Sequence, residues 1–229
     1  MPRRNAAVLE ARFTSAALSA ALAQTADELD VPLSSRQLDA LLAYLDLLAR
    51  WNATYNLTSV NKPSDMLTRH LADCLAILPP LRRQLGEPLK ARILDVGSGA
   101  GLPGVVLAIA APQTSLLCMD KVGKKVAFIR QVAAELGLGN LRAEQSRIES
   151  LKAGLFDVIV SRAFASLSDF VEMTIPHLTG EGVWLAMKGS RPAGELIAIA
   201  ETAEVFHVEP LKVPGLEAQR CLVWMRRRQ

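Results

Sequence analysis

The sequence predicts an α/β fold in which helices cover a mostly parallel β-sheet, and three observations lead to this prediction. A short apolar run at 93–94 ends at Asp95, three glycines follow at alternate positions, and a helical pattern begins at Leu102. Strand, glycine turn and helix in this order form the first unit of an open nucleotide-binding sheet. After Gly101, strand-like and helical segments alternate, and two apolar runs without a helix between them close the chain.

The segments after the glycine turn follow the order expected for such a sheet. The predicted strands lie at 115–119, 141–143, 156–160 and 182–187, and the predicted helices at 121–136, 167–178 and 192–200. The closing runs, 205–208 and 221–225, are joined by a proline- and glycine-containing segment. A parallel pair needs a longer crossover, so these runs predict an antiparallel pair at one edge of the sheet.

The chain before residue 91 has a mainly helical pattern. Helices are expected at 16–29, at 35–51 and from Pro63 onward, where Pro79 and Pro80 end the pattern. The Ser34 to Gln37 spacing is that of a capping box at the start of the second helix. We expect residues 1–90 to form a helical cap that packs on the core without folding independently, and residues 91–229 to form the ligand-binding domain.

Composition limits the class of protein. With 229 residues, half of them hydrophobic, the chain can bury one sizeable core and carry an extension. The net charge of +3 permits a nucleic-acid partner. Three scattered cysteines favour a reducing compartment and predict neither a disulfide framework nor a metal site. The sequence shows no signal peptide and no apolar run of about 18 residues, so we expect a cytoplasmic protein without a membrane segment.

The glycine turn leaves two cofactor classes open. Gly99, Gly101 and Gly104 spell the GxGxxG pattern of dinucleotide dehydrogenases, which is a weak signal on its own. Asp95, two residues before Gly97, and the closing antiparallel pair favour S-adenosylmethionine instead, because a carboxylate at the strand end can face a cationic ligand. At the end of the second strand, Asp120 is predicted to bind ribose hydroxyls, and helix capping is the alternative.

The end of the fourth predicted strand bears on the methyl acceptor. Ser161 to Phe164 contains neither the Pro-Pro-aromatic turn typical of amine methylation nor a nucleophilic cysteine. A ring nitrogen such as guanine N7 has an in-plane lone pair, so its methylation relies on proximity and orientation. Arg162 can donate two hydrogen bonds to guanine or phosphate, and the alternative for Arg162 is a surface salt bridge.

Six short motifs occur in one order along the chain. They are Asn56-Leu57-Thr58-Ser59, Arg69-His70-x-x-Asp73, Asp95 to Gly104, Gln145 to Glu149, Ser161-Arg162-Ala163-Phe164-Ala165, and Lys188-Gly189. Together they resemble the bacterial 16S rRNA guanine-N7 methyltransferase family, also called glucose-inhibited division protein B. The resemblance covers nearly the whole chain after about residue 35. It implies a Rossmann-like class I S-adenosylmethionine methyltransferase sheet with a C-terminal antiparallel strand and an N-terminal helical extension.

The resemblance also implies a function: transfer of a methyl group from S-adenosylmethionine to N7 of one guanine in small-subunit rRNA. The turn glycines Gly97, Gly99 and Gly101 and Leu102 would then line the methionine end of the cofactor. Ile148 and Glu149 would hold the adenine through backbone groups. Arg162 would sit beside both the cofactor and the base.

Four further residues are hypotheses for the acceptor side. Asn56, Arg69 and His70 are expected to shape the guanine pocket, and Lys188 to approach phosphate or the base. We expect a monomer that reads rRNA in an assembled or assembling 30S subunit. RNA contacts are expected at Arg82, Arg83, Lys121, Lys124, Lys125, Arg142, Arg147 and Arg226 to Arg228. A small-molecule methyltransferase, and less so an NAD-dependent dehydrogenase, remain alternatives.

Overall fold

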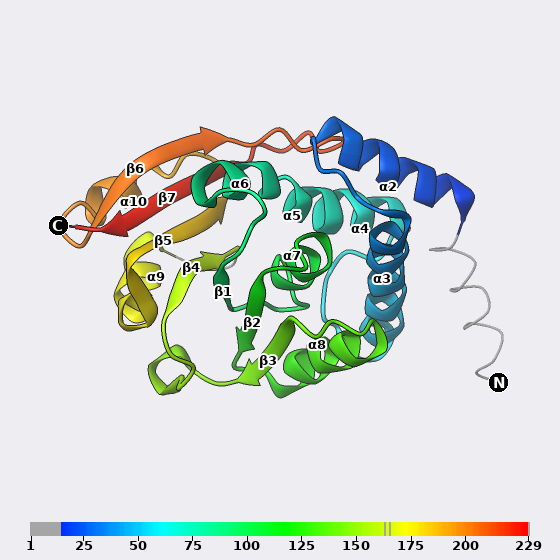
Figure 1. The fold of residues 1–229 in the computed structure, drawn as a ribbon, viewed down its shortest axis with the longest axis horizontal. Helices are drawn as coiled ribbons and strands as arrows, with labels where there is room; N and C mark the ends of the chain where they lie inside the picture. The colour runs from blue at the N-terminus through cyan, green and yellow to red at the C-terminus, as the bar shows by residue number, and fades with distance from the viewer. Residues whose placement is uncertain (1–14, 163, 165, 229) are drawn as a thin grey trace.

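A computed structural model describes residues 15–162, 164 and 166–228 of the chain (Figure 1). Seven strands form one sheet in the order β3-β2-β1-β4-β5-β7-β6. The strands are β1 Arg92–Val96, β2 Ser115–Asp120, β3 Leu141–Gln145, β4 Phe156–Ser161, β5 Leu178–Lys188, β6 Ala203–Pro210 and β7 Cys221–Arg227. Strands β1 to β5 pair in parallel, whereas β7 is antiparallel to both β5 and β6. The predicted mostly parallel sheet with a closing antiparallel pair is confirmed.

Helices cover both faces of this sheet. Alternate strand residues supply two hydrophobic clusters, with Ile93 and Leu185 in one and Leu94 and Trp184 in the other. The first cluster packs under α2 Ala16–Glu28, α3 Ser35–Tyr55, α6 Leu78–Leu85, α7 Gly104–Ala110 and α8 Gly123–Glu135. The second packs under α9 Leu167–Thr174 and the segment after α10 Ala193–Ala198. Three layers, helices on sheet on helices, result from this alternation.

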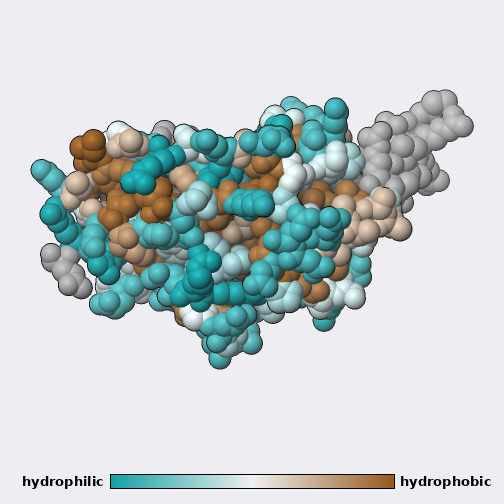
Figure 2. Space-filling model, turned by 90° about the horizontal axis from the view of Figure 1, so that it is seen from above, coloured by the Kyte–Doolittle hydropathy of each residue, from teal (hydrophilic) through white to brown (hydrophobic). Residues whose placement is uncertain are grey.

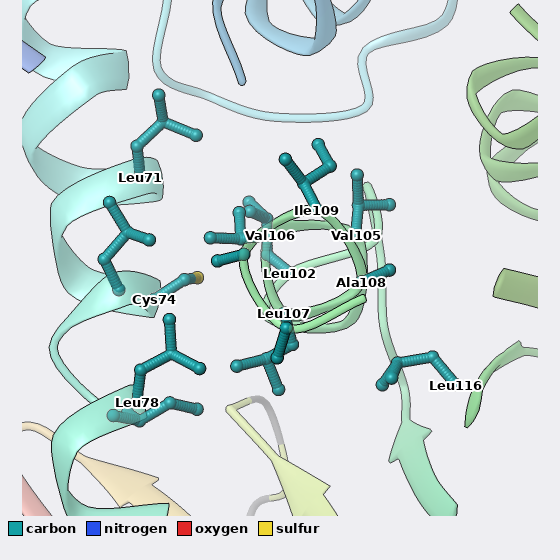
Figure 3. Packing of buried hydrophobic residues seen from close by; sticks show 14 of the residues in the cluster. Leu71, Cys74, Leu78, Leu102, Val105, Val106, Leu107, Ala108, Ile109 and Leu116 are labelled. Atoms are coloured by element: carbon teal, nitrogen blue, oxygen red, sulfur yellow. The ribbon is translucent and has the colours of Figure 1, made fainter. Parts of the chain in front are cut away.

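The N-terminal helices share the core of the sheet. Leu71, Cys74 and Leu78 face Val106 and Leu107 of α7, and all five side chains are buried (Figure 3). Burial of this kind contributes about 25 cal/mol per Å² of apolar surface. Among the described residues, most of the buried side chains of the N-terminal helices therefore belong to the same hydrophobic cluster as one face of the sheet.

The predicted capping box at the start of α3 is confirmed. The Ser34 backbone N–H donates to the Gln37 side chain at 2.9 Å, and the Gln37 N–H donates to the Ser34 hydroxyl at 3.3 Å. The Gln37 amide also donates to the Ile109 carbonyl at 3.0 Å, at the C-terminal end of α7. One residue thus caps α3 and joins it to the helix that follows the glycine turn.

Several element boundaries differ from the prediction, including the end of α3 at Tyr55 instead of 51, and proline explains two of the differences. Pro79 and Pro80 do not end a helix but occupy the first turn of α6, where a missing N–H leaves no hydrogen bond unmade. The helix expected over 167–178 ends at Thr174 and is followed by a 3-10 turn, Ile175–His177, that contains Pro176. Strand β5 consequently begins at Leu178, earlier than predicted.

The helix expected from Pro63 is interrupted by a wider turn. It consists of α4 Pro63–Met66, the π-helix η1 Leu67–Ala72 and α5 Asp73–Leu75. Single π turns inside helices recur at functional sites because they change the direction of side chains and carbonyls. This one carries Arg69 and His70.

The surface seen from above is largely hydrophilic, with apolar side chains gathered toward the end that carries β6 and α10 (Figure 2). The most exposed large apolar side chain of the described residues is Ile197 of α10, at 79%. In the part of the chain that the structure describes, no helix combines the length and hydropathy needed to span a membrane.

Candidate functional site

The turn after β1 is built around glycine conformations. Gly97, Gly99 and Gly101 all have positive φ, between 59° and 86°. A Cβ atom on Gly101 would overlap the Val105 side chain, and one on Gly104 would overlap the Cys118 sulfur. Glycine is required at Gly101 both for its backbone angle and for the close approach of α7.

Asp95 supports this turn from below. Its side chain is fully buried, and Oδ2 accepts a hydrogen bond from the Gly104 N–H at 2.8 Å. Burial raises the pKa of Asp95 to about 7, although the Gly104 hydrogen bond and the Arg162 charge lower it. The second oxygen, Oδ1, has no hydrogen-bond partner among the described residues. Asp95 thus lies behind the turn, holding the start of α7, and not in the lining of the cavity described next.

A cavity of about 370 Å³ lies beside the turn, at the edge where β1, β2 and β3 end. We call it the glycine-turn cavity. Four predicted residues line it: Gly97, Asp120, Ile148 and Glu149. The other lining residues are Val96, Met119, Lys121, Val122, Lys125, Ser146, Arg147, Phe164 and Met173. Gly99 and Gly101 lie in the turn itself, and the Leu102 side chain is buried in the core, so Leu102 could contact a ligand only through its backbone.

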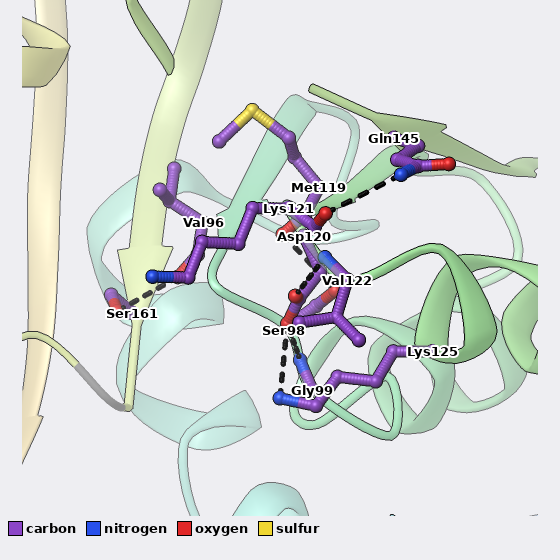
Figure 4. Close-up of polar contacts among 10 residues, drawn as sticks. All are labelled: Val96, Ser98, Gly99, Met119, Asp120, Lys121, Val122, Lys125, Gln145 and Ser161. Carbon is purple, nitrogen blue, oxygen red and sulfur yellow. Dashed lines mark hydrogen bonds and ion pairs between the residues drawn. The ribbon is translucent and has the colours of Figure 1, made fainter. Parts of the chain in front are cut away.

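Asp120 joins the turn to the second strand (Figure 4). Oδ2 accepts from the Gly99 N–H at 3.0 Å, and Oδ1 accepts from the Val122 N–H at 2.9 Å, just before α8. The Lys125 ammonium lies 3.5 Å from Oδ2. Asp120 therefore lines the cavity and holds Val122, the residue before α8, but it does not cap that helix, which has no side-chain cap hydrogen bond from any described residue. Ribose binding by Asp120 stays a prediction. A carboxylate has about four acceptor positions, so capacity for a ligand hydroxyl remains.

The Arg162 guanidinium lies just beyond β4, next to the end of β1. It donates to the Arg69 carbonyl at 3.1 Å and to Asp73 Oδ2 at 3.3 Å. Arg220, from the segment before β7, donates to Asp73 Oδ1 at 2.8 Å. Asp73 is only 2% exposed, whereas the two arginine side chains are about one quarter exposed. We call Arg69, Asp73, Arg162 and Arg220 the Asp73 cluster.

Burial lowers the pKa of the Arg162 guanidinium, but acidic neighbours including Asp73 raise it above its usual value, so the group stays charged. His70 lies close by and is 4% exposed. Burial and the Arg162 charge lower the pKa of His70 to about 4, so its imidazole is neutral near pH 7. Nε2 lies 3.0 Å from the Thr58 hydroxyl, and Nδ1 has no hydrogen-bond partner within the described part of the chain.

The family model for rRNA small subunit methyltransferase G (GidB) matches residues 37–223. The chain belongs to this family. It is 53% identical over 95% of its length to ribosomal RNA small subunit methyltransferase G of Methylibium petroleiphilum, and covers 98% of that protein. The corresponding protein of Leptothrix cholodnii is 54% identical over 89% of this chain and 93% of its own.

Solved structures show the same fold at low sequence identity. An N1-methyltransferase of 1,6-didemethyltoxoflavin from Burkholderia thailandensis aligns with a TM-score of 0.56 and 12% identity, over 86% of this chain and 92% of that one. TrmN from Thermus thermophilus aligns with a TM-score of 0.53 and 18% sequence identity, over 71% of this chain and 53% of that one. The sheet is therefore the Rossmann-like sheet of methyltransferases, as predicted.

Two residues predicted for the acceptor side of this family member lie in other surroundings: one is exposed at a helix end, and the other is held in an ion pair. Asn56 is exposed and adopts a left-handed conformation at the C-terminal end of α3. The Lys188 ammonium forms an ion pair with Glu195 at 2.9 Å, and Glu195 also accepts from the Leu167 N–H at 2.7 Å. Neither side chain is hydrogen-bonded to Arg162. The motif alanines Ala163 and Ala165 lie outside the described residues.

The sequence interpretation missed three supporting residues. Tyr44 is fully buried in α3, and its hydroxyl donates to the Ala100 carbonyl of the glycine turn at 2.8 Å. His177 Nε2 lies 3.1 Å from the Ile148 carbonyl and so holds one wall of the cavity. Arg220 completes the Asp73 cluster. A tyrosine among the leucines of an apolar helix face was a usable signal, whereas the isolated Arg220 offered none.

The predicted RNA-contacting cations fall into two groups. Several already have partners: Arg82 with Glu87, Arg83 with Glu209, Lys124 with the Tyr55 carbonyl, Lys125 with Asp120, Arg226 with Glu204, and Arg227 and Arg228 with backbone carbonyls. By contrast, Lys121, Arg142 and Arg147 are exposed, and within the described residues their side chains make no hydrogen bond or ion pair. Solvated cations of the second group contribute more to phosphate binding, because no ion pair has to break.

Proposed function

We propose that this chain transfers a methyl group from S-adenosylmethionine to N7 of one guanine in 16S rRNA. The observation that carries the proposal is that two parts of a site, the glycine-turn cavity and the surroundings of Arg162, lie side by side in a member of the rRNA small subunit methyltransferase G family. We call them the two half-sites. The glycine-turn cavity follows β1, and Arg162 follows β4, the neighbouring strand. Ligands of open α/β sheets bind at this edge, beyond the carboxyl ends of the strands.

The residues of the glycine-turn cavity fit the proposed cofactor. When bound, S-adenosylmethionine supplies an electrophilic methyl group on a positively charged sulfur. Asp120 would accept hydrogen bonds from the ribose, and Ile148 and Glu149 would hold the adenine. Gly97 lines the cavity with no side chain, so the methionine end can lie against its backbone. Asp95, close behind the turn, would keep the Gly104 end of the turn in place for the ligand through its 2.8 Å hydrogen bond.

The acceptor side needs orientation more than proton transfer. Guanine N7 has an in-plane lone pair and no proton to lose, so no general base is required. This agrees with a buried His70 whose lowered pKa leaves it neutral and shielded. Arg162 would hold the base or its phosphate, because a guanidinium can donate two parallel hydrogen bonds. Arg69, His70 and Asn56 would shape the guanine pocket from the cap, and Lys188 would reach the RNA after leaving Glu195.

The proposed substrate is the rRNA within an assembled or assembling 30S subunit, and the proposed active form is a cytoplasmic monomer. The structure supports recognition of a folded RNA, because aromatic side chains for base stacking are few: 5% of the chain. Recognition would then depend on shape and on phosphate contacts.

The test is tritium transfer from labelled S-adenosylmethionine to small subunits and to naked rRNA, followed by mapping of the modified nucleotide. Label at N7 of a single guanine is the expected result. Cofactor binding without transfer to either RNA would contradict the proposal and favour a small-molecule acceptor. Thermal stabilisation by NAD and not by S-adenosylhomocysteine would instead favour a dehydrogenase.

A further inference from the structure

A second groove, of about 370 Å³, lies next to the Asp73 cluster. It is located where β5 ends, β7 begins and β6 ends: Lys188 pairs with Cys221, and Cys221 pairs with Pro210. Strand β5 is parallel to β4, and Ser161 at the end of β4 pairs with Ala186. The groove is therefore on the same edge of the sheet as Arg162.

The polar side chains of this groove suit an anion. Arg191, Arg220, Ser190 and Gln219 line it, and none of its described lining residues is a carboxylate. Every polar side chain in this set can donate a hydrogen bond, and the two arginines are charged. Gly189 adds backbone without a side chain, so a polymer could approach closely.

Two other basic hollows of the surface differ in this respect. The hollow that contains Arg92 and Arg142 also contains Glu144, and the one at Arg83 contains Glu209. A carboxylate in the lining repels phosphate, and Glu209 is in addition paired with Arg83 at 2.6 Å. The groove of Arg191 and Arg220 thus combines two cations with an acid-free lining.

The two arginines of the groove have different partners. Arg220 is tied to Asp73, which also binds Arg162, so one carboxylate links the groove to the end of β4. Arg191 is exposed, and its side chain has no hydrogen bond or ion pair within the described residues. Cys221 also lines the groove; burial raises the pKa of its thiol, while the nearby charges of Arg191 and Lys188 lower it.

We propose that this groove binds the sugar-phosphate backbone of the rRNA next to the target guanine, with Arg191 contacting a phosphate. The proposal rests on the proposed function and adds the surface that positions the RNA strand. Phosphate contacts set the register of a protein on nucleic acid. Through Arg220 and Asp73, the bound backbone would be fixed relative to Arg162.

The test uses the full chain and small ribosomal subunits that lack the N7 methyl group. Arg191→Ala should raise the dissociation constant for these subunits about tenfold, the loss of one charged phosphate contact, and reduce the salt dependence by about one counterion. Arg36→Ala is the matched control: Arg36 is also exposed and forms no ion pair with any residue that the structure describes, but it lies at the start of α3. The control and the wild type should bind alike.

Three readouts separate the possible failures. Unaltered affinity for S-adenosylhomocysteine in Arg191→Ala would show that the fold and the cofactor site are intact. If the wild type methylates rRNA but Arg191→Ala and Arg36→Ala bind subunits equally, or if the salt dependence does not change, the groove proposal is overturned. If the wild type transfers no methyl group to any RNA, the proposed function itself fails.

Discussion

The glycine-turn cavity is held by carboxylates that accept backbone N–H groups from nearby segments, whereas the Asp73 cluster is held by ion pairs between side chains from distant segments. Around the cavity, the carboxylates of Asp95 and Asp120 accept N–H groups of Gly104, Gly99 and Val122. The two residues of each bonded pair are at most 21 positions apart in the chain. In the cluster, Asp73 meets arginines 89 and 147 residues away.

This difference predicts two kinds of sensitivity. A site made by backbone geometry should be damaged by changes in glycine and should tolerate changes in nearby charges. A site made by an ionic cluster should show the reverse. The results expected for the following variants either support this difference in sensitivity between the two half-sites or contradict it.

The largest expected effect concerns Arg162. Arg162→Ala should reduce methyl transfer to small subunits about 1,000-fold, because misplacement of the acceptor forfeits much of the gain from orientation. Affinity for S-adenosylhomocysteine should change less than about threefold, since Arg162 does not line the glycine-turn cavity. Single-turnover transfer and calorimetry would measure the two quantities.

Arg162→Lys is the matched variant for this experiment. Lysine keeps the charge but lacks the planar guanidinium, so the rate of methyl transfer by Arg162→Lys should lie between those of the wild type and Arg162→Ala. Equal losses of cofactor affinity and transfer in both variants would mean that the two half-sites are not separate.

The second prediction compares two glycines with similar backbone angles. Gly101→Ala should lower the free energy of unfolding by about 3 kcal/mol, because it adds a clash with Val105 to a left-handed φ of 86°. Gly137→Ala has a φ of 64° but nothing within 4 Å, so about 1 kcal/mol is expected. Urea unfolding would measure both. Equal losses would show that close packing of α7 on the turn is unimportant.

The sequence could predict most of the cavity because its signals are local. A glycine turn, a carboxylate at each strand end and a following helix are consecutive in the chain, so the spacing of Asp95, Gly97 and Asp120 defines their geometry. Parallel strands then bring Ile148 to the same edge. The direction of the Asp95 side chain could not be predicted, since burial behind the turn depends on how α7 packs.

The Asp73 cluster could be predicted only in part. Asp73 and Arg162 stand in recognisable motifs, but nothing in their spacing shows that they form an ion pair. Arg220 precedes a strand whose place beside β5 is decided by the whole sheet. Lys188 stands in a recognisable motif too, but its pairing with Glu195 depends on how the segment with α10 lies against the end of β5.

The third prediction concerns the carboxylate that joins the cluster. Asp73→Asn should lower the free energy of unfolding by about 2 kcal/mol, because Arg162 and Arg220 lose a buried partner but remain partly exposed. Methyl transfer should fall further than cofactor affinity, since Arg162 is no longer held. Asp73→Glu should restore part of the transfer. A loss of cofactor affinity as large as the loss of transfer would contradict the assignment of Asp73 to the acceptor side.

The smallest expected effect is a pair of opposite pH dependences. The pKa of Asp95 is raised to about 7, so its contribution to stability is lost as the pH rises from about 4 toward 7, where the unfolded chain ionises and the folded chain does not. The pKa of His70 is lowered to about 4, so its contribution is lost as the pH falls from about 6.5 toward 4. In the wild type these two slopes oppose each other.

When one of the two groups is replaced, the pH dependence of stability should therefore show the contribution of the other group alone. Relative to the wild type, Asp95→Asn should make the free energy of unfolding rise more steeply with pH between 5 and 6.5, and His70→Gln should make it fall, each by about 1 kcal/mol per pH unit. Asparagine can still accept the Gly104 N–H, so the turn keeps its support. Urea unfolding at pH 5, 6 and 7 measures both slopes. A variant whose slope equals that of the wild type would mean that the replaced group has the same pKa in the folded and the unfolded chain, which would contradict its burial-induced shift.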